Sequence, residues 1–456
     1  MTKYAEVITR IKEDMEQGGL RRGDQLPSIR SLSLELNCST NTIIKAYQQL
    51  EQEHLIYPVP RSGYFVVDPQ RIPNEGKGEE DAIDFVSAGP DREIMPYRDF
   101  QHSMNQAIER YREDLFSYSE IQGLHSLRVQ LARQLRDVQV FTVPENIFVV
   151  TGSQQALHLL ISLPFPNGKC RLAVEQPTHT SMLESIRQQR VHAYGVEVTR
   201  DGLNLEHLES LFRTGEIKLF YTVSRFHNPT GYSYTNEEKK RMVELAQNYD
   251  VYIIEDDYLG DLDTNSKQDP MFAYDSSGRV IYTKSFSKVM LPGLRLGLAV
   301  LPSELHESFL RAKYAADVHT PVLMQGALEI YLENGMFETH LQKMRTIYRN
   351  KAEKLREACR RYLPAGTAYT EPRSGFYSVL ELPPPLTAEQ LRKHLAVKGV
   401  LVNEASGMYL PEFRKSTVIR LSVSQVAEEQ IDRGIMLIAE GIWELLLASR
   451  KGIQFI

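Results

Sequence analysis

The chain has 456 residues, of which 42% are hydrophobic and 25% are charged, and its formal net charge is −6. This length exceeds one ordinary domain, and the composition is that of a globular protein. The acidic balance excludes a protein that binds nucleic acid over its whole surface, so any DNA contact must come from a local patch.

The three cysteines are Cys38, Cys170 and Cys359. They are odd in number and form no C-x-x-C pair, which argues against a disulfide framework. We expect buried structural thiols in a reducing compartment, and therefore a cytoplasmic protein. No apolar run approaches the roughly 20 residues that span a bilayer, and the N-terminus does not resemble a signal peptide.

Residues 1–67 follow the pattern of three helices and a hairpin. The sequence predicts an amphipathic helix over residues 4–17, a short helix after the N-cap Ser28, and a third helix over residues 40–53. Two β-type runs, residues 55–58 and 64–67, flank the turn Arg61-Ser62-Gly63 and predict a hairpin. This order is that of a winged helix-turn-helix domain.

The run G-D-x-L-P-S-x-R-x-L, followed by T-x-x-x-A-Y-x-x-L-E and G-Y-F-V, resembles the DNA-binding head of the GntR family of bacterial regulators. The resemblance implies that residues 1–67, called the head below, bind double-stranded operator DNA. A small helical module that binds another protein is the alternative. The residues that match the family's DNA-contacting positions are Ser28, Arg30, Ser39, Thr40, Asn41, Thr42, Lys45, Arg61 and Gly63.

Residues 68–82 contain prolines, glycines and charges with little apolar content, and they predict a flexible linker. Beyond it, apolar β-type runs alternate with helical patterns. Continuous apolar strands between helices predict a mostly parallel sheet covered on both faces, with ligands at the carboxyl ends of its strands. The predicted strands are residues 147–150, 171–174, 218–222, 251–254, 279–283 and 296–301.

Polar motifs follow these strands: Gly152-Ser153-Gln154, Asn228-Pro229-Thr230-Gly231, Asp256-x-Tyr258, Ser285-x-x-Lys288 and Arg295. A lysine amine that loses its proton forms a Schiff base, and a carboxylate can hold a pyridinium nitrogen protonated. Hydroxyls, a guanidinium and a helix N-terminus suit a phosphate. Each motif alone also fits a simpler interpretation: a solvated loop lysine, a common strand-glycine-helix turn, or an acidic metal site or helix cap.

In this order the motifs resemble the fold-type I aminotransferases, over residues 83–456, called the body below. The resemblance implies that pyridoxal 5'-phosphate (PLP) forms an aldimine with Lys288. It implies that Asp256 pairs with the pyridine nitrogen and that Asn228 and Tyr258 bind the phenolic oxygen. The implied phosphate ligands are Ser153, Gln154, Ser285 and Arg295.

Three further residues match family positions. Tyr118 matches a tyrosine that is often lent by the partner subunit. Arg420 matches the arginine that grips a substrate carboxylate, although a surface strand arginine is the alternative. His179 stands where relatives usually carry an aromatic ring stacked on PLP, which makes it a cofactor-binding residue of reduced stacking area.

The resemblance implies a multidomain fold: a winged helix-turn-helix head and an α/β fold-type I PLP-dependent transferase domain. The large subdomain is expected over about residues 120–305. The smaller α+β C-terminal subdomain is expected over about residues 306–456, together with residues 83–119.

A GntR-type head joined to an aminotransferase-like body is similar to the MocR subgroup of regulators. This similarity implies a domain-swapped homodimer that regulates transcription and senses an amino acid or amine through an external aldimine. The alternative is a working aminotransferase with an accessory head. A catalytically dead dimer platform ranks last, because Lys288 and Asp256 are both present.

Overall fold

The structure is a computed structural model that describes residues 3–20, 24–53, 55–59, 63–66, 82–199, 202–265, 267–371 and 375–450. The chain forms two compact units, Met1–Glu80 and Asp81–Ile456, which contain the head and the body. Residues 68–81 of the predicted linker lie outside the described residues, as does Arg61. The exact domain boundaries therefore stay predictions.

The head contains the three helices and the hairpin that its sequence predicts. They are α1 (Lys3–Glu16), α2 (Ile29–Glu35), α3 (Thr40–Gln52), β1 (Ile56–Val59) and β2 (Gly63–Val66). The Ser28 hydroxyl caps α2 and the Ser39 hydroxyl caps α3, because each accepts the N–H three residues ahead. Val7, Ile43 and Leu50 fill the core, whereas Leu34 of α2 is exposed.

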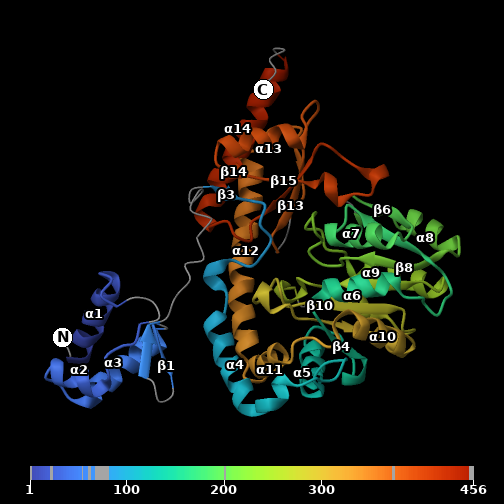
Figure 1. Cartoon of the computed structure of the whole chain (residues 1–456). Coiled ribbons are helices and arrows are strands. Elements are labelled where there is room, and N and C mark those ends of the chain that lie inside the picture. Colours follow the sequence, from blue (N-terminus) through green and yellow to red (C-terminus); the bar gives the residue numbers. More distant parts are fainter. Residues whose placement is uncertain are drawn as a thin grey trace. The chain divides into compact units, whose positions relative to one another are not determined.

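The body is organised around an eight-stranded sheet of order β4-β11-β10-β9-β8-β5-β6-β7 (Figure 1). Strands β10, β9, β8, β5 and β6 are parallel, whereas β11 runs antiparallel to both β4 and β10, and β7 antiparallel to β6. The mostly parallel sheet is confirmed, and β6 and β7 add to the predicted strands. The bounds are β4 (Ile147–Val150), β5 (Arg171–Gln176), β6 (Ala193–Thr199), β7 (Gly202–Leu203), β8 (Ile217–Thr222), β9 (Tyr252–Asp256), β10 (Val280–Ser285) and β11 (Gly297–Val300).

Both faces of this sheet are buried, which explains why its strands read as continuous apolar runs. Side chains alternate between faces along a strand. Phe220 and Ile253 belong to one core with residues of α8 and α9, whereas Tyr221 and Ile254 belong to a second core with residues of α6 and α7.

Helix α10 packs against α6, and α11 packs against α4 and α5, so both contact elements beside the large sheet although the sequence assigns them to the small subdomain. The subdomain boundary near residue 305 stays a prediction. The bounds are α4 (Tyr97–Tyr111), α5 (His125–Arg136), α6 (Ser153–Ser162), α7 (Thr180–Gln189), α8 (Leu205–Arg213), α9 (Asn236–Asn248), α10 (His306–Asp317) and α11 (Val322–Glu333).

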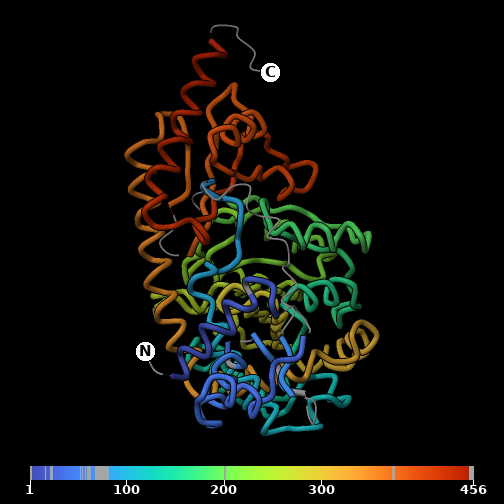
Figure 2. Tube along the Cα trace, turned by 60° about the vertical axis from the view of Figure 1, so that its left-hand side comes forward, coloured from blue at the N-terminus to red at the C-terminus, as the bar shows by residue number. Residues whose placement is uncertain are grey.

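The small subdomain has a four-stranded sheet of order β12-β13-β16-β15, antiparallel throughout. The long helix α12 contacts α14 at one end of the body and α11 at the other (Figures 1 and 2). The bounds are α12 (Met336–Tyr362), β12 (Ala368–Tyr369), β13 (Tyr377–Glu381), α13 (Ala388–Val397), β14 (Val400–Leu401), β15 (Asn403–Glu404), β16 (Val418–Ser422) and α14 (Glu428–Arg450).

The three cysteines are free thiols. Cys359 is buried and Cys38 is half-buried, but Cys170 is exposed, so the expectation of a buried thiol is wrong there. Cys170 directly precedes β5, where the chain enters the sheet from its surface. None of the helices among the described residues is both long and apolar enough to span a membrane.

Residues 83–88, called the strap below, follow the linker in sequence and are fastened to the small subdomain. The strap begins with β3 (Ile83–Asp84), which pairs with β14 in parallel. The Phe85 N–H donates to the Leu401 carbonyl at 3.0 Å, and the Phe85 carbonyl accepts from the Ser422 N–H at 2.9 Å. The Phe85 ring is fully buried and lies against Gly434 of α14.

We expect Gly434→Ala to destabilise the body, because a Cβ at this position would lie 2.5 Å from the Phe85 ring. Overpacking typically costs about 1–3 kcal/mol of unfolding free energy, and better helix propensity offsets about 1 kcal/mol of it. Urea denaturation followed by the fluorescence of the single tryptophan, Trp443, measures the effect. Gly407→Ala is the control, because nothing lies within 4 Å of that added Cβ. Equal midpoints for the two variants would contradict this packing argument.

Candidate functional site

The polar motifs lie where the strands of the large sheet end. Parallel strands β8, β9 and β10 are neighbours, so their carboxyl ends bring Asn228, Asp256 and Lys288 to one edge. The antiparallel strand β11 sits between β4 and β10, and it begins just after Arg295. The motifs that are scattered in sequence therefore meet at one edge of the sheet.

Lys288 is half-buried, and its amine donates a hydrogen bond of 2.7 Å to the Ala88 carbonyl of the strap. Burial, followed by the charges of Arg420 and Arg295, lowers the pKa of Lys288 from 10.5 to about 8. At pH 7 roughly one amine in ten is then neutral, against roughly one in three thousand for an unperturbed lysine. The site therefore prepares this amine as a nucleophile.

An anion-binding corner forms around the start of α6. Arg295 has a left-handed backbone, and its guanidinium donates to the Ser287 hydroxyl at 3.2 Å. A Cβ on Gly152 would lie 2.5 Å from this guanidinium, and one on Gly297 would lie 2.7 Å from the Ser153 nitrogen. These glycines let the arginine and the helix N-terminus approach each other, which suits a phosphate.

The other predicted phosphate ligands border this corner. The Ser285 hydroxyl accepts the Ser287 N–H at 3.2 Å, and Gln154 is exposed in the first turn of α6. Ser287 was not predicted as a ligand, although its position between Ser285 and Lys288 is a signal that the sequence offers.

Asp256 is buried at the end of β9. Its carboxylate accepts hydrogen bonds from the Tyr221 hydroxyl at 3.0 Å and the Thr283 hydroxyl at 3.2 Å. Burial raises the pKa of Asp256 from 3.8 to about 7. A cationic partner would return this carboxyl to its charged form, so the site suits a protonated ring nitrogen. Tyr221 is a neighbour that the sequence analysis did not identify.

The acids on either side of Asp256 have other partners. Asp257 forms a buried ion pair with Arg225, and Glu255 accepts the backbone N–H groups of Met271 and Phe272. Neighbouring residues of a strand face opposite sides, which turns both carboxylates away from Asp256. They therefore act as structural anchors rather than as one acidic cluster.

Asn228, which follows β8, and Tyr258, which follows β9, are both buried. The Asn228 Oδ1 atom has no hydrogen-bond partner within the part of the chain that the structure describes. Tyr258 is 6% exposed. Buried polar groups are usually satisfied, so such an atom points to a missing ligand group.

The Asn-Pro-Thr-Gly turn rests on a buried network that the sequence analysis missed. The Glu175 carboxylate accepts the hydroxyls of Thr222 and Tyr234 at 2.5 Å each, and His227 Nε2 lies 3.2 Å from it. His227 Nδ1 in turn lies 2.8 Å from the Thr230 hydroxyl. Glu175 lies near the end of β5. This strand-end position, which it shares with the predicted site residues, is the sequence signal that could have identified it.

His179 caps α7 and faces the same site. Its Nδ1 accepts the Ser181 N–H at 3.3 Å and lies 2.5 Å from the Ser181 hydroxyl. Burial, then Lys288, Arg420 and His227, lower the pKa of His179 to about 4. The neutral ring must carry its proton on Nε2, because Nδ1 is an acceptor. Its centroid lies 6.4 Å from that of Tyr258.

Arg420 lies on β16 and is 7% exposed, so it is buried rather than on the surface. Its guanidinium donates to the Val86 carbonyl of the strap and lies 5.5 Å from the centre of the Tyr377 ring. Arg420 Nε makes no hydrogen bond with any described residue. Tyr377 is a neighbour that sequence reasoning did not single out.

Among the predicted site residues of the body, Tyr118 lies apart from the others within the single chain. It is 91% exposed, and its ring centroid lies 6.0 Å from that of His319. Its position after α4 leaves it on the surface of the body.

The predicted DNA-contacting residues gather at the starts of α2 and α3. Ser28 and Ser39 are the two N-caps, Arg30 is exposed on α2, and Thr40, Asn41 and Thr42 form the first turn of α3. Arg30 and Lys45 make no ion pair within the described residues, which leaves both cations free for phosphate. Gly63 opens β2 with φ 110°, and Arg61 lies outside the described residues.

Comparison with known proteins covers both units. Residues 94–438 match the family "Aminotransferase class I and II", and residues 3–66 match "Bacterial regulatory proteins, gntR family". The uncharacterized HTH-type transcriptional regulator YcxD of Bacillus subtilis is 43% identical over 96% of this chain and 99% of its own. The regulator YjiR of Escherichia coli is 30% identical over 92% and 96%.

Solved structures match the body. Kynurenine aminotransferase of Pyrococcus horikoshii has a TM-score of 0.75 and 27% identity, over 80% of this chain and 92% of its own. LysN of Thermus thermophilus, an α-aminoadipate aminotransferase complexed with N-(5'-phosphopyridoxyl)-L-leucine, has a TM-score of 0.73 and 27% identity, over 80% and 93%.

The body is thus a fold-type I aminotransferase domain, and the head is a GntR-type helix-turn-helix. The chain belongs to the GntR family of transcriptional regulators, in the MocR subgroup that joins these two parts. PLP is the cofactor of this class. The site fits it through the nucleophilic Lys288, the buried Asp256, the unsatisfied Asn228 and the anion-binding corner.

We expect Lys288 to react with PLP faster than exposed lysines, at a rate that rises with pH through about 8, because the neutral amine is the nucleophile. Borohydride reduction and peptide mass spectrometry locate the label. Lys288→Arg should lose it, whereas Lys343→Arg, a change at an exposed lysine of α12, should keep it. Labelling spread evenly over exposed lysines would contradict the assignment.

His179 makes stability depend on pH. Its folded pKa of about 4 lies below the ordinary 6.5, so between these values the unfolded chain binds a proton that the folded chain does not. Stability contributed by neutral His179 is therefore lost as pH falls from 6.5 to 4. We expect His179→Phe to gain stability relative to wild type over this window in urea denaturation. Parallel curves for His179→Phe would refute the assignment.

Proposed function

We propose that the protein senses an amino acid or amine at PLP and converts its binding into a change of operator binding by the head. The observation that carries this proposal is the strap. Its carbonyls at Val86 and Ala88 accept hydrogen bonds from Arg420 and Lys288, and the strap directly follows the linker to the head.

Bound PLP supplies an aldehyde that condenses with primary amines. In this proposal Lys288 provides the amine, Asp256 holds the ring nitrogen, and Asn228 and Tyr258 orient the ring oxygen. Ser153, Gln154, Ser285 and Arg295 hold the phosphate, and the neutral His179 ring covers the cofactor. Arg420 binds a carboxylate of the effector, in a bidentate pair that favours amino acids.

Release of the strap gives the coupling a physical route. An effector carboxylate at Arg420 competes with the Val86 carbonyl for the guanidinium. Condensation with PLP would take the Lys288 donor from the Ala88 carbonyl, and an effector amine that takes the place of Lys288 would return it. Effector binding therefore changes how the segment that follows the linker is fastened. The effector then binds the two states of the strap with different affinity, as allosteric coupling requires.

The head is proposed to place the start of α3 in the major groove. Ser39, Thr40, Asn41 and Thr42 present short polar side chains there, and the helix N-terminus favours phosphate. Ser28, Arg30 and Lys45 add phosphate contacts, and Arg61 and Gly63 form the wing.

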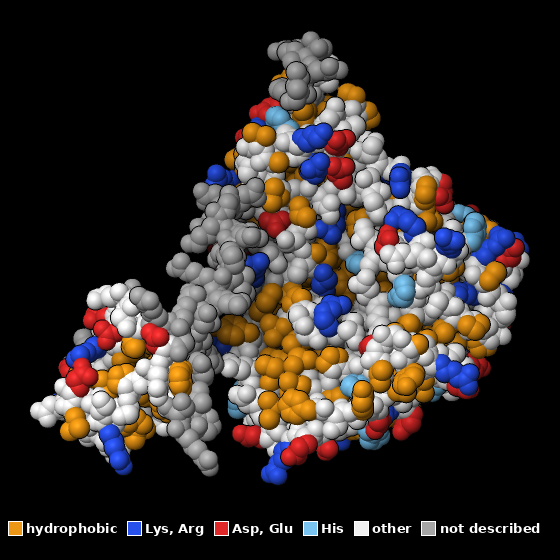
Figure 3. Space-filling view, viewed as in Figure 1, with side chains coloured by type: hydrophobic (Ala, Val, Ile, Leu, Met, Phe, Trp, Pro, Cys, Tyr) orange, Lys and Arg blue, Asp and Glu red, His pale blue; other side chains and the backbone are white. Residues whose placement is uncertain are grey.

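A homodimer is proposed, with each head over the partner's body and Tyr118 lent to the partner's site. Figure 3 displays hydrophobic side chains gathered on one face of the body near α4 and α11. A contiguous apolar patch marks an association surface. Exposed large apolar residues of this region include Ile108, Phe116 and Tyr118. A cytoplasmic location is part of the same proposal.

Turnover of amino acids is the second candidate function. It is favoured by one observation: Lys288 and Asp256, the residues that chemistry on PLP needs, both have pKa values shifted toward pH 7. A keto-acid product in the presence of an acceptor keto acid would identify it.

The test uses DNA sites selected by the full-length PLP-loaded chain from a random library. An amino acid that changes the absorbance of bound PLP should change DNA affinity about 5- to 150-fold, the range of typical coupling energies. Arg420→Met should lose the response to amino acids while it retains PLP, and Lys45→Ala should lose DNA affinity with an unchanged absorbance response. A spectral response with no change in DNA affinity, accompanied by keto-acid release, would favour the aminotransferase.

A further inference from the structure

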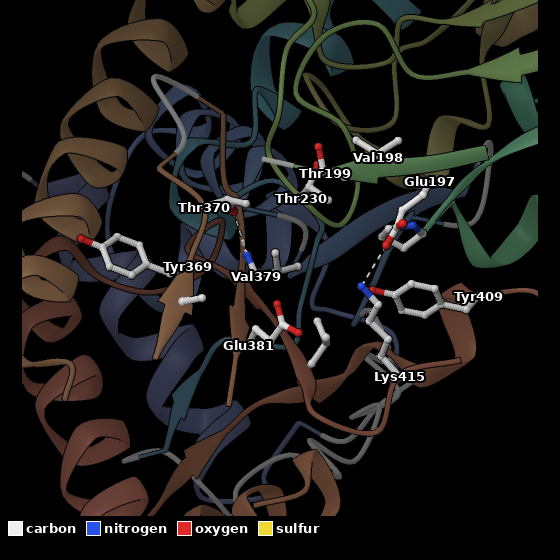
Figure 4. A pocket seen from close by; sticks show the side chains of 13 residues that line it. Glu197, Val198, Thr199, Thr230, Tyr369, Thr370, Val379, Glu381, Tyr409 and Lys415 are labelled. Atoms are coloured by element: carbon white, nitrogen blue, oxygen red, sulfur yellow. Dashed lines mark hydrogen bonds and ion pairs between the residues drawn. The ribbon is translucent and has the colours of Figure 1, made fainter. Parts of the chain in front are cut away.

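The body holds a pocket of about 260 Å³ between the large and small subdomains, apart from the residues proposed to bind PLP. Strand β6 and the residues Pro177 and Thr230 form one wall, and the face of the small sheet forms a second. Figure 4 displays this arrangement. The lining residues are Pro177, Glu197, Val198, Thr199, Thr230, Ala368, Tyr369, Thr370, Val379, Glu381, Tyr409, Lys415 and Val418.

The third wall, which contains Tyr409, is fastened to the large sheet on both sides of that residue. The Thr178 N–H donates to the Met408 carbonyl at 2.8 Å, and the Leu410 N–H donates to the Gln176 side chain at 2.7 Å. Tyr409 is therefore held in place by its neighbours, and the pocket is a built feature of the fold.

The described lining residues carry a net charge of −1. Glu197 and Lys415 form an ion pair of 3.1 Å. Glu381, the other charged lining residue, is exposed and has no ion-pair partner in the described part of the chain. A ligand with one positive charge would balance this wall, whereas an anion would meet an unpaired carboxylate.

Tyr409 supplies the second polar group that a ligand could use. It is 7% exposed, and its hydroxyl, which has no hydrogen bond to any described residue, is not among the fully buried polar atoms. Figure 4 places this hydroxyl and the Glu381 carboxylate toward the interior of the pocket. Burial, then Glu381 and Glu197, raise the pKa of Tyr409, so it stays a neutral phenol. Its oxygen can accept an N–H, and its ring can face a cation.

We propose that this pocket is a second binding site, which takes a small protonated amine. Glu381 provides the counter-charge, and the Tyr409 hydroxyl accepts the N–H of the ligand. The volume lies just below the roughly 300–1,000 Å³ of sites for drug-sized molecules, so it suits a ligand of a few heavy atoms.

The pocket differs in chemistry from the PLP site. It would bind a ligand through the ligand's positive charge, whereas the PLP site binds an amine through condensation with an aldehyde. The pocket is nevertheless connected to the PLP site. Thr230 lines the pocket, and its hydroxyl lies 2.8 Å from His227 in the turn that contains Asn228. An occupant that touches both β6 and the small sheet stabilises the arrangement in which these walls are adjacent.

The probe is N,N-dimethylethanolamine, a tertiary amine that carries an N–H when protonated and cannot form a Schiff base. Calorimetric titration of the PLP-loaded full chain should detect saturable binding with an unchanged PLP absorbance. Glu381→Gln should weaken binding about two- to fivefold, as expected for the loss of an exposed counter-charge. Tyr409→Phe should weaken it about tenfold, as expected for the loss of a hydrogen bond to a charged group.

Glu412→Gln is the matched control, since this exposed glutamate is close to Tyr409 in sequence but does not line the pocket. Lys288→Ala should leave the affinity for the tertiary amine unchanged, which separates this site from the proposed sensing function. Absence of saturable binding, or equal affinity for Glu381→Gln and Glu412→Gln, would overturn the proposal. Binding that is lost in Lys288→Ala would place the amine in the PLP site instead.

Discussion

Two cationic side chains of the body, Lys288 and Arg420, are both held by carbonyl groups of one short strap. A buried cation without a partner is costly, so these carbonyls stabilise the site in the absence of a ligand carboxylate. The same contacts tie Lys288, the small subdomain and the start of the body into one unit. A new partner that takes the same N–H group of either cation displaces the strap, whereas Arg420 Nε makes no hydrogen bond with any described residue.

The remaining polar groups of the site divide into satisfied and unsatisfied ones. Glu175, Asp257 and Glu255 are fully engaged and hold the strand ends in place. Asn228 and Arg420 keep buried atoms that have no partner among the described residues, and Asp256 has a pKa raised by burial. The supporting polar groups thus have their hydrogen-bond partners, whereas the groups that would face a ligand do not. A preorganised site differs from a packed core in this way.

The sequence predicted the head closely, because caps and apolar periodicity are local signals: Ser28 and Ser39 begin their helices as the pattern requires. It also predicted the strand ends that carry Lys288, Asp256 and Asn228, since buried parallel strands read as apolar runs. It did not identify Tyr221, Tyr377 or Glu175, whose roles depend on which strands are neighbours in space. The exposed Cys170 and the packing of α10 against α6 were missed for the same reason: both depend on tertiary placement.

The strap also bears on how long an intact chain survives. Its backbone is fastened by a two-residue strand pairing and a few hydrogen bonds, far fewer than join the central strands of the large sheet. Segments fastened so sparsely open more often than a sheet interior, and frequent opening is what a protease needs. Because Lys288 and Arg420 contribute part of that fastening, a ligand that takes either side chain from the strap, as proposed above, would also expose this segment to proteases. The same two side chains would then affect both the proposed response and the survival of the intact chain.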